Sequence, residues 1–319
     1  MKKYQLLFLM LYLALHHDVD KIDERFLDHK QNVTISKDYE LINLVKVTGP
    51  ESIAFGCKGE GPYVGVSDGP ILKWHGPKFG WKEFAIPSSI RYSLNFQNRD
   101  VTSTNPNLEP ICGRPLGLKF NLVTCDFYIA QTLISLIERI LFKFINVLDI
   151  DSSIGVIYFT DNSTTFQRMY AYCLSISTDN SERLLKYDLH TKNTSVLYIG
   201  LMFPNGVALN KNYSFLLVAE TTRRRILKFN LGTNNFEPKV FAELPRVPDN
   251  IKMNHKGEFW VALNAGRLGE IDDDIPDPIG IKYDQEGRIL KQLDGNGKDA
   301  FSSITLSTKG KLPGQSPNF

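Results

Sequence analysis

The sequence predicts an all-β fold, a six-bladed β-propeller in which blade two is shortened and the C-terminal closure is incomplete. Short apolar runs of about four to seven residues, rich in Val, Ile, Leu, Tyr and Phe and bounded by Gly, Asp, Asn or Pro, recur along the chain. They group into an entry strand, a central strand and outer strands, repeated six times. Dividing 319 residues by six gives about 53 per unit, close to a four-stranded blade. A β-sandwich or barrel of similar strand density is the alternative.

Six short segments are the expected entry strands, each the first strand of a unit. A second strand with an aromatic or aliphatic centre follows most of them, as in 155–164 and 257–263, and residues 61–74 predict a hairpin. Helical periodicity is clear only in 133–145, where we expect a helix. The expected entry strands are 51–55, 114–120, 146–150, 205–209, 250–253 and 279–284.

Composition argues against several functions. The formal net charge is only +2, so nothing in the overall balance attracts nucleic acid. The four cysteines are far apart and form no CxxC pair, which argues against a thiolate zinc site. No segment reaches the roughly 18 consecutive apolar residues of a spanning helix, so we expect no stable membrane insertion.

The N-terminus has the pattern of a secretory signal. Lys2 and Lys3 precede an apolar run at 4–15, and a polar stretch follows it. We therefore expect a signal peptide at 1–17, a lead-in at 18–37 and the propeller, possibly truncated, at 38–319. A buried or membrane-anchoring N-terminal helix is the alternative. A secretory protein can be glycosylated at N-x-S/T sequons, and four occur, at Asn32, Asn162, Asn193 and Asn212.

Several long motifs carry a family resemblance. They are PESIAF, GPYVGVSDGPILKW, CGRPLGLKF, GVIYFTD, FPNGVAL, FLLVAETTRRRILKFNL, FAELP, PDNI and GEFWVAL, in order from about residue 38 to 295. The sequence resembles the strictosidine synthase-like family. This resemblance implies a six-bladed propeller related to paraoxonase-type calcium-dependent esterases and lactonases. It also implies a plant protein of the vacuole or the extracellular space.

The resemblance implies two kinds of chemistry. Strictosidine synthase condenses tryptamine with the aldehyde secologanin and uses a glutamate as general acid/base. Ser302 occupies the best-matching position here, and no glutamate follows Glu286. A serine cannot replace the glutamate, so the resemblance favours the hydrolase-like branch, which holds an axial calcium ion.

The hydrolase-like branch implies oxygen ligands at the starts of entry strands. Carboxylate and amide oxygens suit calcium, with water completing its coordination. An Asn before Gly is also common in turns, and an exposed Glu needs no ligand to explain it. The candidate calcium ligands are Glu51, Asn146, Asn205, Asp249 and Asn250.

No residue matches the catalytic histidine of paraoxonase-type enzymes. Arg114 occupies its place, either to polarise a carbonyl or bind a carboxylate, or to form a structural salt bridge. The other histidines border the signal or lie in expected turns, so we expect them at the surface. The six histidines are His16, His17, His29, His75, His190 and His255.

The chain also departs from the family pattern. The segment QTLISLIERILFK, at 131–143, replaces a Gly-rich hairpin of the family, with about twenty residues missing, and the closing strand pair at the C-terminus is not found. We expect unpaired strand edges at both places. The usual partner of Cys112 is absent from 92–111, and Cys57 or Cys125 remains as a substitute.

Together these features predict a monomeric secretory propeller that acts on a small-molecule substrate. Metal-dependent ester or lactone hydrolysis is the leading hypothesis. The alternatives are amine–aldehyde condensation in alkaloid biosynthesis and a catalytically inactive, glycosylated binding scaffold.

Overall fold

The computed structural model describes residues 42, 44, 49–67, 69–88, 109–132, 135–137, 140–170, 181–233, 236–264 and 278–294. Within them the fold is all-β, with the helix α3 (Glu109–Cys112) and the 3-10 turn η3 (Arg168–Tyr170) as short exceptions. In the part described, no helix is long and apolar enough to cross a membrane. The proposed signal peptide at 1–17, the lead-in at 18–37, Asn32 and Ser302 lie outside the described residues.

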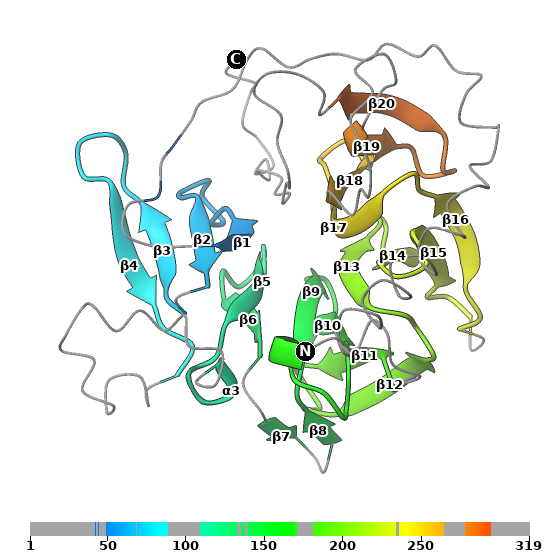
Figure 1. Cartoon of the computed structure of the whole chain (residues 1–319), viewed down its shortest axis with the longest axis horizontal. Helices are drawn as coiled ribbons and strands as arrows, with labels where there is room; N and C mark the ends of the chain where they lie inside the picture. The colour runs from blue at the N-terminus through cyan, green and yellow to red at the C-terminus, as the bar shows by residue number, and fades with distance from the viewer. Residues whose placement is uncertain are drawn as a thin grey trace, which may run out of the picture.

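Four antiparallel sheets of four strands form complete blades, and Figure 1 shows them arranged around a common centre as a propeller. In ring order they are the first, third, fourth and fifth blades. The first blade has β1 (Pro50–Ala54), β2 (Tyr63–Val66), β3 (Ile71–Trp74) and β4 (Trp81–Ala85). The third has β9 (Ile145–Asp151), β10 (Val156–Asp161), β11 (Arg183–Asp188) and β12 (Thr194–Ile199). The fourth has β13 (Pro204–Leu209), β14 (Phe215–Glu220), β15 (Arg225–Asn230) and β16 (Lys239–Glu243). The fifth has β17 (Val247–Met253), β18 (Phe259–Asn264), β19 (Pro278–Tyr283) and β20 (Ile289–Asp294).

In the described part of the chain, the sheet of the second blade has fewer strands than its neighbours, in line with the shortened blade that the sequence predicts. Its described strands are β5 (Pro115–Phe120) and β6 (Phe127–Gln131), which pair only with each other. The following strands, β7 (Ser135–Ile137) and β8 (Ile140–Phe142), form a separate two-stranded sheet. In Figure 1, β5 and β6 lie between the first and third blades.

The helix predicted over 133–145 is wrong, because β7 and β8 form a hairpin there. The burial of residues in β8 explains the difference. Phe142 is fully buried and its ring lies 5.7 Å from that of Phe159 in the third blade, whereas Leu141 is 39% exposed. An apolar segment this short is compatible with the residue period of a helix and with that of a strand, and packing against the third blade selects the strand.

The first strand of each blade faces the centre, and these inner strands neighbour one another in the order β1, β5, β9, β13, β17 (Figure 1). Their close approach requires glycine. A Cβ at Gly206 would lie 2.6 Å from the backbone nitrogen of Ile251, closer than packed atoms allow. The Asn205-Gly206 pair therefore lies within a strand beside β17, and the turn interpretation is wrong.

The segment 279–284, expected as a sixth entry strand, is instead contained in β19 and its following residue. β19 is the third strand of the fifth blade and pairs with β18 on one side and β20 on the other. This strand resembles an entry strand in sequence because it, too, is a short apolar run. The described residues thus supply five inner strands, and they do not confirm the six-bladed count.

The apolar cores lie between neighbouring blades. Between the third and fourth blades, Tyr158 and Leu184 pack with Val207 and Leu216. The central strands β10 and β14 are buried along their whole length, whereas the outer strand β12 is partly exposed. Such continuous burial explains why central strands are apolar runs rather than alternating ones.

A disulfide joins the first and second blades. It links Cys57, in the turn after β1, to Cys125, in the turn before β6, with the two Cα atoms 5.7 Å apart. The two cysteines considered as partners for Cys112 thus pair with each other. Cys112 lies at the end of α3, and neither of these cysteines takes the place of its usual partner in the family.

Candidate functional site

The predicted ligands gather at one end of the propeller. Strand pairing places the starts of the inner strands beside the ends of the second strands, as in Ile145 opposite Asp161 and Pro204 opposite Glu220. We call this the entry end, and the opposite end, where inner and second strands are joined by turns, the hairpin end. Glu51, Asn146, Asn205 and Asp249 lie in the first half of an inner strand, and Asn250 follows at the middle of β17, so we assign all five to the entry end.

Two of the predicted ligands are in direct contact. The side-chain Nδ2 of Asn146 donates a hydrogen bond of 3.0 Å to Oδ1 of Asn205. Asn146 is 5% exposed, and Asn205 is half-buried. The contact joins the third and fourth blades and leaves the Asn146 carbonyl oxygen available to another partner.

Asp249 and Asn250 continue this arrangement into the fifth blade. Both are buried within β17, at 8% and 4% exposure. The backbone oxygen of Asp249 would lie 2.8 Å from a Cβ at Gly206, which puts this part of β17 directly beside Asn205. Three neighbouring inner strands therefore place Asn146, Asn205 and the Asp249 segment side by side.

Glu51 has a cation as its neighbour. Arg114 Nη2 lies 3.0 Å from Glu51 Oε2, and this ion pair joins the first and second blades. Thr132 Oγ1 accepts a hydrogen bond of 3.0 Å from the backbone nitrogen of Arg114 and fixes the start of β5. The buried Nε of Arg114 has no acceptor in the described part of the chain. The salt bridge expected as one role of Arg114 is present, with one N–H donor left over.

Two buried acids hold the loops that lead to Asn146 and Asn205. Asp161 Oδ1 accepts from the backbone nitrogen of Phe144, at 3.3 Å, and its Oδ2 from Arg183, at 2.7 Å. Glu220 Oε1 likewise accepts from the nitrogen of Met202, at 2.8 Å, and its Oε2 from Arg225, at 2.5 Å. We call these two arrangements the acid clasps.

The acid clasps occupy matching places in the third and fourth blades. Each acid ends a second strand and each arginine begins a third strand. Burial raises the pKa of Asp161 to about 6, even though Arg183 acts in the opposite direction. Sequence reasoning missed these residues, although the repeated ends FTD and VAE, each followed by an arginine at the next strand, were a usable signal.

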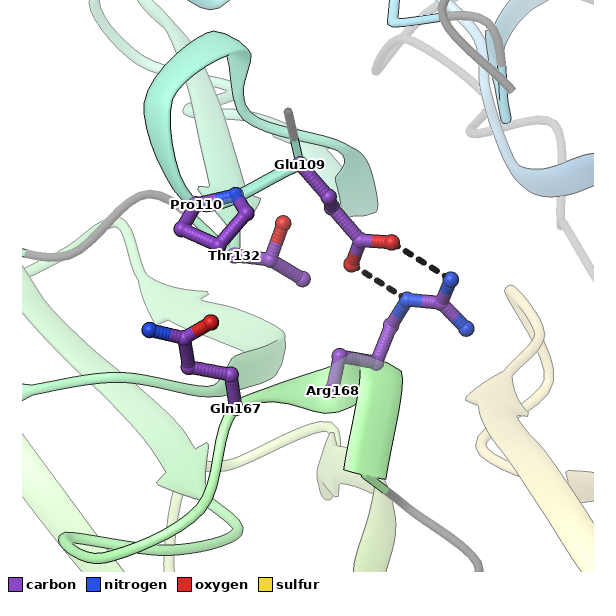
Figure 2. Close-up of a pocket in the computed structure, with 5 residues that line it drawn as sticks. All are labelled: Glu109, Pro110, Thr132, Gln167 and Arg168. Carbon is purple, nitrogen blue, oxygen red and sulfur yellow. Dashed lines mark hydrogen bonds and ion pairs between the residues drawn. The ribbon is translucent and has the colours of Figure 1, made fainter. Parts of the chain in front are cut away.

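A small pocket lies between α3 and η3 (Figure 2). Arg168 donates to both carboxylate oxygens of Glu109, from Nε at 2.5 Å and from Nη2 at 2.6 Å. The two residues are only 26% and 10% exposed, so they form a largely buried ion pair. The pocket was not predicted, because 59 residues separate its two charges. Its lining residues are Glu109, Pro110, Thr132, Gln167 and Arg168.

The residue that leads into Asn205 has a strained backbone. Phe203 has a φ of 54°, which is uncommon for a bulky side chain. Its carbonyl accepts from the nitrogen of Thr221 at 3.0 Å, and its ring meets that of Phe144 edge-on at 5.8 Å. Phe144 and Phe203 precede the two inner strands of the asparagine pair, so apolar packing also sets the positions of these strands.

The glycosylation candidates differ in exposure. Asn193 and Asn212 are exposed in turns, where a glycan has room. Asn162 is fully buried, and neither polar atom of its side chain has a hydrogen-bond partner among the described residues. A glycan at Asn162 is incompatible with this packing.

The described histidines are at the surface. His75, His190 and His255 are all exposed, as expected, and the other three lie outside the described ranges. Among the residues that the structure describes, no three His, Cys, Asp or Glu side chains group as metal ligands. Any metal at the entry end would therefore depend on asparagine oxygens.

Comparisons with solved structures place the fold. The chain matches one chain of a crystal structure of a nidogen/laminin complex with a TM-score of 0.55 and 13% identity, over 82% of this chain and 88% of the other. It matches a gluconolactonase from Xanthomonas campestris with a TM-score of 0.53 and 14% identity, over 78% and 76% of the two chains. Identities this low show similarity of fold alone.

Comparisons of sequence are more specific. A family model described as strictosidine synthase matches residues 146–233, which span the third blade and most of the fourth. Protein STRICTOSIDINE SYNTHASE-LIKE 10 of Arabidopsis thaliana is 47% identical, over 86% of this chain and 84% of that protein. Protein STRICTOSIDINE SYNTHASE-LIKE 3 of the same plant is 34% identical, over 89% and 83%. With such identity along most of its length, the chain belongs to the strictosidine synthase-like family.

Proposed function

We propose that the entry end binds a small-molecule ester or lactone and hydrolyses it with the help of a calcium ion. The observation that carries this proposal is the meeting of Asn146 and Asn205, 3.0 Å apart, beside the Asp249 segment. Hard oxygen donors from three blades suit calcium, which accepts carbonyl and carboxylate ligands in flexible geometry. A calcium ion bound there would supply a Lewis acid for the substrate carbonyl.

The donor set fits calcium with one qualification at Glu51. Asn146, Asn205, Asp249 and Asn250 would hold the ion, whereas Glu51 is paired with Arg114. Arg114 then has a role of its own in this proposal. Its unused Nε–H is a donor for a substrate carbonyl or carboxylate.

The test is thermal unfolding of the purified protein with calcium and with EDTA. We expect calcium to raise the melting temperature, Asn205→Ala to abolish the increase, and Asn193→Ala, at an exposed turn, to leave it unchanged. A panel of esters and lactones then tests for turnover that Asp249→Ala removes. An EDTA-insensitive protein, in which Asn205→Ala also changes nothing, contradicts the proposal.

A catalytically inactive binding scaffold is the second candidate. It is favoured by the engagement of Glu51 with Arg114 and by the surface positions of the described histidines, which leave no evident general base at the entry end. Calcium-dependent stability without turnover on any ester or lactone would support it. Incubation with tryptamine and secologanin is the corresponding test for the amine–aldehyde condensation.

We also propose that the protein is a six-bladed ring and that it enters the secretory pathway, directed to the vacuole or the extracellular space. The six-bladed ring is supported by a gap between β1 and β17: Figure 1 shows these two strands apart, whereas every other consecutive pair of inner strands lies side by side. A crystal structure with only five blades would contradict the ring. Fusion of residues 1–17 to a fluorescent protein tests the targeting, and a cytosolic signal would contradict it.

A further inference from the structure

A second group of charges lies near the centre of the ring, closer to the hairpin end than the asparagine pair. It consists of Lys119 on β5, Asp149 on β9 and Lys252 on β17, and we call it the central charge cluster. Lys119 Nζ lies 2.6 Å from Asp149 Oδ1. Asp149 is three residues beyond Asn146, roughly 10 Å along the strand, so this cluster is separate from the entry end.

The acceptors of Asp149 are already engaged. Its Oδ1 also accepts from the backbone nitrogen of Ile150, at 2.9 Å, and its Oδ2 accepts from that of Leu209, at 2.9 Å. Leu209 lies at the end of β13, so groups from four consecutive inner strands converge here. Asp149 is 7% exposed. Its carboxylate oxygens accept hydrogen bonds from Lys119 and from two backbone N–H groups, and none from Lys252.

Lys119 and Lys252 lie on inner strands that are not neighbours in the ring, β5 and β17. In the ring order, β9 and β13 stand between their strands, as Figure 1 shows. The charges of Lys119 and Asp149 nevertheless act on Lys252. Two strands that are not neighbours come within electrostatic range only through the middle of the ring.

The cluster has one positive charge more than it has negative charges. Lys252 is 8% exposed and makes no hydrogen bond or ion pair with any other described residue. The next carboxylate along the strand, Asp151, accepts from the backbone and hydroxyl of Ser153 at the hairpin end. Buried charges are normally paired, because removing a lone ammonium group from water is costly.

We propose that a small oxyanion, a phosphate or carboxylate group, binds at the centre of the ring between Lys119 and Lys252. The anion supplies the missing negative charge and accepts hydrogen bonds from both ammonium groups. One third of the Lys119 side chain is exposed, which gives solvent ions a route to the cluster. The site uses none of the residues proposed to hold calcium at the entry end.

The direct test is calorimetric titration of the full chain with inorganic phosphate and, separately, with acetate, in sodium chloride of matched ionic strength. We expect saturable binding of at least one oxyanion. Lys252→Met should weaken binding by about tenfold or more, since it removes a charge-assisted contact. The matched control is Lys186→Met, on β11 of the third blade, which should bind as the unmodified protein does.

A second measurement needs no variant. Limited amine modification followed by mass spectrometry should show that the tighter-binding oxyanion slows labelling of Lys252 and Lys119 but not of Lys186. Protection confined to the first two lysines supports the site even if Lys252→Met fails to fold. Absence of saturable binding for both anions, or equal labelling with and without them, overturns it.

Discussion

The second and third blades are neighbours in the ring but are built to different extents. The third has four strands, whereas the second has only β5 and β6 in one sheet (Figure 1). At the end of the second strand, the third blade has Asp161 paired with Arg183 at the start of a third strand. The matching place in the second blade, opposite Pro115, is Gln131. Its Oε1 has no hydrogen-bond partner among the described residues, and no third strand brings an arginine to it.

The difference between the two blades shows that the inner strands position the site residues, whereas the outer strands add further stabilising contacts. The inner strand β5 is packed on both sides, with Leu118 and Phe120 against Tyr63 of the first blade and Gly117 against β9. Two strands therefore suffice to place Arg114 at the entry end. The outer strands add a partner for a buried acid, and only a complete blade can support an acid clasp.

The largest expected effect separates complete blades from the incomplete one. Asp161→Ala and Glu220→Ala should each lower the free energy of unfolding by about 3–5 kcal/mol, because each leaves a partly buried arginine without its carboxylate. Gln131→Ala should cost less than about 1 kcal/mol, since it breaks no ion pair. Urea-induced unfolding measures all three. Similar losses at Gln131 and Asp161 would show that the second blade is as tightly clasped as the third.

The disulfide is expected to matter next, because it ties the incomplete blade to a complete one. The loop that it closes has a sequence separation of 68 residues. The double variant Cys57→Ser, Cys125→Ser should therefore lose about 2–4 kcal/mol of unfolding free energy. A reducing agent should destabilise the unmodified protein by a similar amount and leave the double variant unchanged. A reducing agent that affects both proteins equally would contradict the link.

The fold could be predicted from sequence where a strand is marked by its own residues, as a short apolar run with turn residues on both sides. The strands around Tyr63, Tyr158 and Leu217 were all predicted, because each is a short apolar run between turn residues. The prediction failed at Leu141 and Phe142 and at the segment around Ile281, where one apolar run fits more than one position in the fold. Tertiary packing decided those cases.

The candidate site was predicted in part for a similar reason. Glu51, Asn146 and Asn205 were identified because equivalent strand starts recur in the sequence, and two of them are in contact. The partners Arg168 and Lys119 could not be identified, because their acids, Glu109 and Asp149, lie far away in sequence and in other parts of the ring. Recurrence along the chain reveals equivalent positions, but it does not reveal which side chains of different blades meet.

The smallest expected effect tests whether burial within a complete blade controls the charge of its acid. The folded-state pKa of Asp161 is about 6, above that of an unfolded aspartate, so the folded protein binds the extra proton more tightly. Asp161 should therefore make stability fall as pH rises from about 4 to about 6, and Asp161→Asn removes this contribution. We expect the unfolding free energies of the two proteins to converge toward pH 4 and to separate in favour of the variant by pH 6, apart from a constant offset for the altered bond to Arg183. Other titrating groups are common to both proteins, so their difference isolates Asp161. A difference that does not change with pH would show that Arg183 keeps the carboxyl ionised throughout, and that the clasp, rather than burial, controls its charge.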